Sequence, residues 1–223
     1  MTSLEQKLHF DTIIDRIEKA RLRVSDHHIV KIVAASKYVG ESEIRSLYNI
    51  GHRAFGENKV QDMKLKVDAL EELPLEWHFI GTLQKNKINQ LISLNPYMIH
   101  SIDSLDLAYA LNERLTREGK TLRALLQVNS AYEESKSGFH PDEFTDTYTQ
   151  IASECPNLQL MGIMSIGAHS DETKVIQKSF EITHSLFKKI PNAAVCSMGM
   201  SSDFELAIAC GSNLVRLGSI LFK

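Results

Sequence analysis

The run Val30-Lys31-Ile32-Val33-Ala34-Ala35-Ser36, which ends at Lys37, sets the pattern for the whole chain. A short, continuous apolar run of this kind is typical of a β-strand that is covered on both faces. Seven further runs follow, and every run except the last is followed by a candidate helix. The eight expected strands are residues 30–35, 53–55, 77–80, 98–102, 122–128, 158–166, 194–197 and 213–217. Regular alternation of strand and helix predicts a parallel sheet in an α/β protein.

Eight such units in one sheet most naturally close into a single (β/α)8 barrel of the TIM type. The apolar residues of segment 4–24 follow helical spacing, which predicts an extra helix before the first strand. A doubly wound open sheet is the alternative, because runs as short as 53–55 do not fix the number of strands. No Pro-, Gly- or Ser-rich linker divides the chain, so residues 1–223 are expected to form one domain.

Composition argues against several classes of protein. The net charge is −3, with 25 basic and 28 acidic residues spread along the chain, so a nucleic acid or an anionic lipid surface is not an expected partner. Cys155, Cys196 and Cys210 are odd in number and lack C-x-x-C spacing, which indicates neither a disulfide framework nor a metal site. We therefore expect a protein of a reducing compartment.

The sequence also lacks the marks of export and membrane insertion. The N-terminal residues contain no apolar signal core, and no stretch approaches the ~20 apolar residues that a membrane span requires. These features predict a soluble, cytoplasmic protein, and we expect it to be a monomer.

Lys37 is the candidate for covalent chemistry. In a barrel, the carboxyl ends of the strands form the functional face, and Lys37 follows the first strand there. A lysine that attacks an aldehyde must be uncharged, which burial or a cationic neighbour favours. The alternative is an ordinary surface lysine. Gly218-Ser219, after the last strand, is a candidate phosphate site, so the two ends of the chain together suggest pyridoxal 5'-phosphate (PLP).

Five collinear segments carry a family resemblance. They are AASK at 34–37, FGENKVQD at 55–62, WHFIGTLQKNK at 77–87, SKSGF at 135–139 and SMGMSSD at 197–203. With these segments the chain resembles the YggS/PROSC family of pyridoxal phosphate homeostasis proteins. The resemblance implies a barrel like the N-terminal domain of alanine racemase, which holds PLP as a reversible aldimine on Lys37. It also implies a carrier without an established catalytic reaction, so no residue is assigned as catalytic.

The phosphate of PLP requires backbone N–H groups, hydroxyls and close approach. Gly218, Ser219 and Ser201 are the candidates. Ser202 is assigned instead to a capping box with Glu205 at the start of a helix over residues 203–210. Gly211 is expected to end that helix.

Three further residues are assigned to the cofactor. The resemblance places Arg216 against the pyridine nitrogen, where a side chain that can only donate would keep that nitrogen unprotonated and make PLP a poor electron sink. Asn58 is a candidate contact, and its neighbours Glu57 and Lys59 are expected to shape the loop. His78 is a candidate to point into the barrel near the ring. A core histidine with satisfied hydrogen bonds is the alternative for His78.

Three functions are consistent with these residues. The first is PLP homeostasis, in which the protein holds the reactive aldehyde and delivers it to PLP-dependent apoenzymes. The second is an amino-acid racemase, which is disfavoured because Lys37 is the one obvious acid/base group and because no second catalytic domain follows the barrel. The third is a Schiff-base aldolase that acts on a phosphorylated sugar without a cofactor. Lys136 is an alternative acceptor for PLP.

Overall fold

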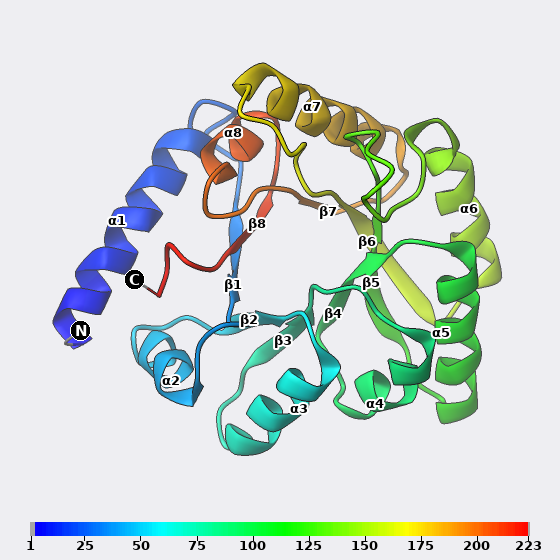
Figure 1. Cartoon of the computed structure of the whole chain (residues 1–223), viewed down its shortest axis with the longest axis horizontal. Coiled ribbons are helices and arrows are strands. Elements are labelled where there is room, and N and C mark those ends of the chain that lie inside the picture. Colours follow the sequence, from blue (N-terminus) through cyan, green and yellow to red (C-terminus); the bar gives the residue numbers. More distant parts are fainter. Residues whose placement is uncertain (1–2, 223) are drawn as a thin grey trace.

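Eight parallel strands form a closed barrel in the order β1-β2-β3-β4-β5-β6-β7-β8, with β8 paired to β1 (Figure 1). The computed structural model describes residues 3–222. The strands are β1 Lys31–Ala35, β2 Ala54–Glu57, β3 Glu76–Phe79, β4 Met98–Ile102, β5 Leu122–Gln127, β6 Leu158–Met164, β7 Val195–Ser197 and β8 Leu214–Leu217. The predicted (β/α)8 barrel is confirmed, and the open sheet is excluded because β1 and β8 pair along four residues, from Lys31 to Ala34.

Helices surround the barrel on the outside (Figure 1). They are α1 Ser3–Arg21, α2 Glu41–Asn49, α3 Val60–Ala69, α4 Ile88–Ser93, α5 Leu105–Glu118, α6 Phe144–Glu154, α7 Thr173–Lys189 and α8 Phe204–Ala209, with short 3-10 turns at Lys85–Lys87 and Pro141–Glu143. None of the helices described within residues 3–222 is both long and apolar enough to cross a membrane.

Helix α1 completes the ring of helices. It packs against α8 and α2, on the outside of the barrel near the end of the described chain (Figure 1). Ile13, Ile17 and Ala20 form its buried face. Arg16 of α1 also contacts α8. It forms an ion pair with Glu205, and its guanidinium lies 4.8 Å from the centre of the Phe204 ring. The predicted extra helix is therefore an integral part of the barrel wall.

The second strand is Ala54–Glu57, whereas the sequence predicts residues 53–55. The guanidinium of Arg53 lies 3.8 Å from the centre of the Tyr48 ring and donates to the backbone oxygen of Tyr48. The residue pairs with β3 begin at Ala54, opposite Glu76, and the backbone oxygen of Arg53 accepts from the N–H of Glu76 at 2.9 Å.

Two core regions separate the outside of the barrel from its interior. The larger one lies between the strands and the helices and includes Phe55, Phe79 and Ile163. The smaller one contains Met98, Leu125 and Met164, which alternate along their strands with members of the first region. Alternation of this kind sends successive side chains to the helices and to the barrel axis.

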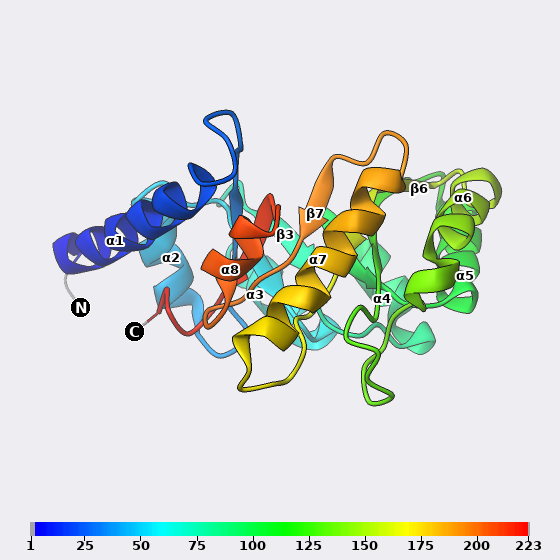
Figure 2. The same ribbon diagram turned by 90° about the horizontal axis from the view of Figure 1, so that it is seen from above.

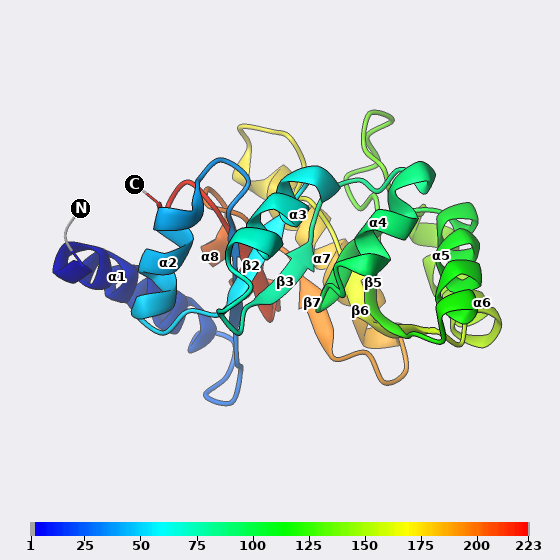
Figure 3. The ribbon, with the colours of Figure 1, turned by 90° about the horizontal axis from the view of Figure 1, so that it is seen from below.

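The two ends of the barrel differ. The loops that follow β5 and β6 project on one side, at the carboxyl ends of the strands (Figures 2 and 3). The loops after α1 and α7 project on the opposite side (Figure 2). We call the end at the carboxyl ends of the strands the mouth of the barrel, and we call the opposite end the base of the barrel.

Candidate functional site

Lys37 lies at a cavity in the mouth of the barrel. The cavity has a volume of about 500 Å³ and is lined from the ends of five strands, by residues that include Lys37, Asn58, Gly81, Asn129 and Lys136. Lys37 follows β1 and is exposed, whereas Asn58 follows β2 and is half-buried. The structure thus brings together Lys37, Asn58 and the alternative lysine, Lys136.

A buried ion pair holds the turn that presents Lys37. Glu57, at the end of β2, is fully buried and accepts hydrogen bonds from Ser36 Oγ at 2.6 Å and from Lys66 Nζ at 2.7 Å. Lys66, on α3, also donates to the backbone oxygen of Ser36 at 2.8 Å. Because both contacts converge on Ser36, the backbone next to Lys37 is fixed. Glu57 shapes the loop, as the sequence predicts, and it does so from inside the fold.

The two lysines of the cavity differ in their contacts. Lys136 Nζ donates to Glu133 Oε1 at 2.9 Å and to the backbone oxygen of Gly167 at 2.7 Å. The hydrogen bond from Lys136 lowers the pKa of Glu133, which favours the ionised carboxylate in this contact. Lys37 Nζ, in contrast, lies 4.9 Å from the centre of the Tyr38 ring. Lys136 is therefore committed to a structural contact, whereas Lys37 is presented to the cavity.

Gly81 allows the mouth to be narrow. A Cβ at this position would lie 2.1 Å from the backbone oxygen of Asn58. No side chain fits in that space, so only glycine lets the loop after β3 approach the loop that carries Asn58. Ser101 Oγ donates to the backbone oxygen of Gly81 and fixes this approach from β4.

The phosphate candidates meet after β7 and β8 and are not among the residues that line this cavity. Ser201 Oγ accepts hydrogen bonds from the backbone N–H groups of Gly218, at 3.1 Å, and of Ile220, at 3.4 Å. Ser219 lies between them in the sequence and is exposed. A hydroxyl and two backbone N–H groups thus converge after β7 and β8, which is the donor set that a phosphate oxygen requires. The pairing of β8 with β1 brings Gly218 next to Ala35, on the Lys37 side of the mouth.

The predicted capping box at Ser202 is wrong. Helix α8 begins at Phe204, and its N-cap is Asp203. Asp203 Oδ1 accepts from the backbone N–H of Met200 at 2.6 Å, and the carboxylate of Glu205 binds Arg16 on α1. A tertiary ion pair therefore takes the side chain that the local motif would have used. Gly211, with φ +100°, lies just past the end of α8, as expected.

Arg216 lies inside the barrel and is 5% exposed. Its guanidinium donates to Ser197 Oγ at 2.6 Å, to the backbone oxygen of Ser197 at 3.0 Å and to that of Ser165 at 2.8 Å. Burial lowers the pKa of Arg216 to about 10, so the side chain is still protonated at neutral pH. Arg216 can therefore only donate hydrogen bonds in the barrel.

His78 does not lie in the mouth cavity with Lys37. Its ring points into the barrel, as predicted, but it lines a different cavity at the base. His78 Nδ1 lies 2.9 Å from His100 Nε2, while His78 Nε2 is buried and has no partner among residues 3–222. His78 is the third of the four residues of β3. Its ring packs against the rings of Tyr97, just before β4, and His100, and these contacts direct it away from the lining of the mouth cavity.

With the fold and the site described, the chain can be compared with known proteins. The family described as alanine racemase, N-terminal domain, matches residues 8–223. A pyridoxal phosphate homeostasis protein of Helicobacter pylori strain J99 is 59% identical over 220 residues, which cover 99% of each chain. The chain belongs to the pyridoxal phosphate homeostasis proteins.

Relatives of this family extend beyond bacteria. The human pyridoxal phosphate homeostasis protein is 37% identical over 207 residues, covering 86% of this chain and 75% of the human one. Among solved structures, PipY of Synechococcus elongatus with PLP bound is 31% identical, with a TM-score of 0.79, and the match covers 94% of this chain and 99% of that chain. The family resemblance based on the five sequence segments is confirmed.

Sequence reasoning missed three residues that organise the barrel of this family member. Lys66 gave no signal, because a lysine on an amphipathic helix is usually solvated. His100 and Ser197 lie in apolar strands, and both are fully buried. A histidine flanked by apolar residues on a predicted barrel strand is the signal that could have identified His100 as an interior polar group.

Proposed function

We propose that this protein binds PLP at the mouth of the barrel and takes part in PLP homeostasis, with Lys37 as the covalent acceptor. The observation that carries the proposal is the contrast between the two lysines of the cavity. Lys136 is held by Glu133 and Gly167, whereas Lys37 is exposed to the cavity. An amine that condenses with an aldehyde, with loss of water, requires this freedom.

Other residues of the mouth suit the rest of the cofactor. We assign the phosphate to Ser201, Gly218 and Ser219, because the Ser201 hydroxyl and the N–H groups of Gly218 and Ile220 already converge there. Asn58, on the cavity wall, is assigned to a polar contact with PLP. The N–H groups of Gly218 and Ile220, which now donate to Ser201 Oγ, would then donate to a phosphate oxygen instead. PLP supplies a reversible covalent bond to an amine.

Arg216 favours storage over catalysis. A protonated arginine offers no proton acceptor and donates from a fixed position, so a pyridine nitrogen facing it stays unprotonated. An unprotonated ring withdraws electrons weakly, which disfavours the carbanion chemistry of a racemase. We therefore propose a carrier, formed by residues 1–223 as one domain and acting as a monomer, that passes PLP to apoenzymes. All three cysteines are free thiols, which supports a reducing, cytoplasmic location.

The first test is spectroscopic. The purified protein is mixed with PLP, and its absorbance is recorded before and after reduction with borohydride. Mass spectrometry then locates the reduced adduct. We expect a yellow protein whose adduct maps to Lys37.

A pair of variants sharpens this test. Lys37→Ala should abolish the reducible adduct and leave the unfolding free energy within about 0.5 kcal/mol of wild type, because the side chain is exposed. Lys136→Ala is the matched control and should keep the adduct on Lys37. An adduct that persists in Lys37→Ala and is lost in Lys136→Ala would move the assignment to Lys136. A protein that never binds PLP would overturn the proposal and leave the sugar-phosphate aldolase to be tested.

A further inference from the structure

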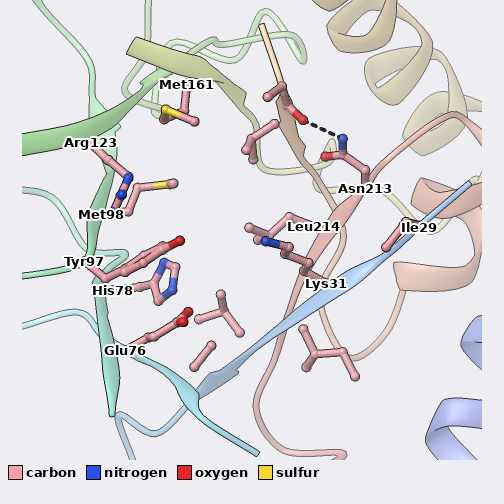
Figure 4. A pocket seen from close by; sticks show the side chains of 15 residues that line it. Ile29, Lys31, Glu76, His78, Tyr97, Met98, Arg123, Met161, Asn213 and Leu214 are labelled. Carbon is pink, nitrogen blue, oxygen red and sulfur yellow. Dashed lines mark hydrogen bonds between the residues drawn. The ribbon is translucent and has the colours of Figure 1, made fainter. Parts of the chain in front are cut away.

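The base of the barrel contains a second cavity, far from the carboxyl ends of the strands. It has a volume of about 330 Å³ and is formed by the first residues of the strands and the loops that precede them. Figure 4 shows side chains from several strands pointing toward this space, among them Lys31, His78, Tyr97, Met98 and Arg123. Nothing in the proposed PLP site uses these residues.

His78 offers the cavity a buried polar atom. The side chain is 3% exposed, and its Nε2 has no hydrogen-bond partner within the described chain. Burial lowers the pKa of His78 to about 3, so the ring is neutral at physiological pH and carries one proton. An unpaired buried polar atom costs about 1–3 kcal/mol, so a ligand atom in the cavity that hydrogen-bonds to Nε2 would be stabilised by this pairing.

A chain of hydrogen bonds decides where that proton lies. Arg216 donates to Ser197 Oγ, which leaves the Ser197 hydroxyl hydrogen available for His100 Nδ1, 3.5 Å away, and we take Ser197 as the donor in this contact. His100 then carries its proton on Nε2 and donates it to His78 Nδ1 at 2.9 Å. His78 therefore carries its own proton on Nε2. The cavity thus contains an N–H donor, which selects an acceptor oxygen on the ligand.

The charges at the opening favour an anion. Lys31 and Arg123 are both exposed and line the cavity, with the Arg123 guanidinium 4.6 Å from the centre of the Tyr97 ring. Glu76 is the one carboxylate among the lining residues, so the lining side chains carry one net positive charge. The walls are apolar, and Met98, Met161 and Leu214 form part of them (Figure 4). Such a site suits a compact apolar body that bears one carboxylate.

We propose that the base cavity is a binding site for a small organic carboxylate, whose oxygen accepts from His78 Nε2 while Lys31 and Arg123 attract its charge. A void left by imperfect packing would be lined by apolar groups and would offer no buried donor. The base of such a barrel normally serves stability alone, so the site would be additional to the one at the mouth. The proposal does not depend on PLP binding.

The test uses methyl NMR of the full-length protein labelled at the methionine methyl groups. Met98 and Met161 line the cavity and report directly on its contents. Benzoate is titrated as the probe, with benzyl alcohol as a neutral molecule of similar shape and inorganic phosphate as an anion without an apolar body. We expect a saturable shift of both methyl signals with benzoate, and binding of the two control molecules weaker by about tenfold or more, the effect of one charge-assisted contact.

Variants of the exposed residues Lys31 and Arg123 test the role of their charges without disturbing the buried core. Lys31→Gln combined with Arg123→Gln changes exposed side chains and should weaken benzoate binding about tenfold. Lys64→Gln combined with Arg117→Gln removes the same charges from exposed positions on α3 and α5 and should leave the affinity unchanged. His78→Phe should abolish the preference for benzoate over benzyl alcohol.

The possible results separate clearly. Selective benzoate binding that is lost in the Lys31/Arg123 variant supports the carboxylate site. Absence of any shift at Met98 and Met161, or equal binding of benzoate and benzyl alcohol by the wild-type protein, would overturn the proposal. The second of these results would identify the base cavity as an apolar void.

Discussion

At the scale of single residues, a few buried polar groups organise each end of the barrel. Glu57 accepts from Ser36 and Lys66 beneath the mouth, and its second oxygen, Oε2, is buried without a partner in the described part of the chain. A buried carboxylate is tolerated only while its partners remain, because removal of one partner leaves an uncompensated charge. Lys66 is therefore more important for stability than its place on a surface helix suggests.

Lys66→Ala should lower the unfolding free energy by about 3 kcal/mol, the usual cost of breaking a buried ion pair. Lys64→Ala is the matched control on the same helix. It removes an exposed pair with Asp68 and should cost less than about 0.5 kcal/mol. Urea denaturation measures both values. Adding Glu57→Gln to Lys66→Ala should recover part of the loss, and equal losses in the two lysine variants would contradict this account.

His78 makes stability depend on pH. Burial lowers its pKa to about 3, with Lys31 and His52 as further contributors, while the unfolded chain titrates near 6.5. Below pH 6.5 the unfolded state therefore binds more protons than the folded state, and stability falls as the pH falls. Between pH 7 and pH 5 this loss amounts to about 2 kcal/mol.

His78→Gln should remove that part of the pH dependence, whereas His27→Gln, in an exposed loop, should keep it. The measurement is the unfolding free energy from urea denaturation at pH 7 and at pH 5 in a buffer free of carboxylates. Wild type and His78→Gln losing the same stability over this interval would show that His78 is not kept neutral by the fold.

At the scale of elements, α1 closes the wall of the barrel. It packs against α8 and α2, and His9 Nε2 forms a 2.5 Å hydrogen bond with the backbone oxygen of Ile220, in the segment that follows β8. These contacts join the first helix to parts of the chain that are distant in the sequence. Helix α1 is thus expected to unfold together with the barrel.

Ile17→Ala should test this expectation. Ile17 is 4% exposed, so the cavity left by the substitution should cost about 3 kcal/mol. Leu8→Ala, on the same helix at 58% exposure, should change stability by less than about 0.5 kcal/mol. If Ile17→Ala lowered helical content without changing the midpoint of barrel unfolding, α1 would be an independent appendage.

At the scale of the whole molecule, the polar chain from Arg216 through Ser197 and His100 to His78 connects β8 with β3 across the barrel interior. Arg216 donates to Ser197, and the order of donors inferred above continues from Ser197 to His100 and His78. In that order, an arginine that we assign to the cofactor sets which nitrogen of each histidine carries the proton.

Ser197→Ala should interrupt this chain. Without the serine hydroxyl, His100 Nδ1 loses its donor, and the histidine pair becomes free to reverse its proton order. In wild type, we expect nitrogen-15 NMR of the imidazole rings to show the proton on Nε2 of both His78 and His100. The variant should show a mixture of tautomers, and an unchanged spectrum would indicate that Ser197 does not direct the pair.

The sequence predicted much of this molecule. Its alternating apolar runs indicated the barrel and the functional face, because burial on both sides of a parallel strand leaves a continuous apolar run. Its motifs identified the family and the placement of Lys37 and Asn58 at one mouth. Ser202 shows where local reasoning fails, because Glu205 is taken by Arg16 on a helix almost two hundred residues away in the chain.

The sequence alone determined which strands form and which residues follow them, since periodicity and burial are local properties. Only the tertiary structure decided that α1 closes the ring, that Lys136 is bound by Glu133 while Lys37 is presented to the cavity, and that His78 faces the base. These outcomes depend on contacts between segments that are distant in the sequence. The energy of a buried charge or hydrogen bond is set by such partners, and no local pattern contains them.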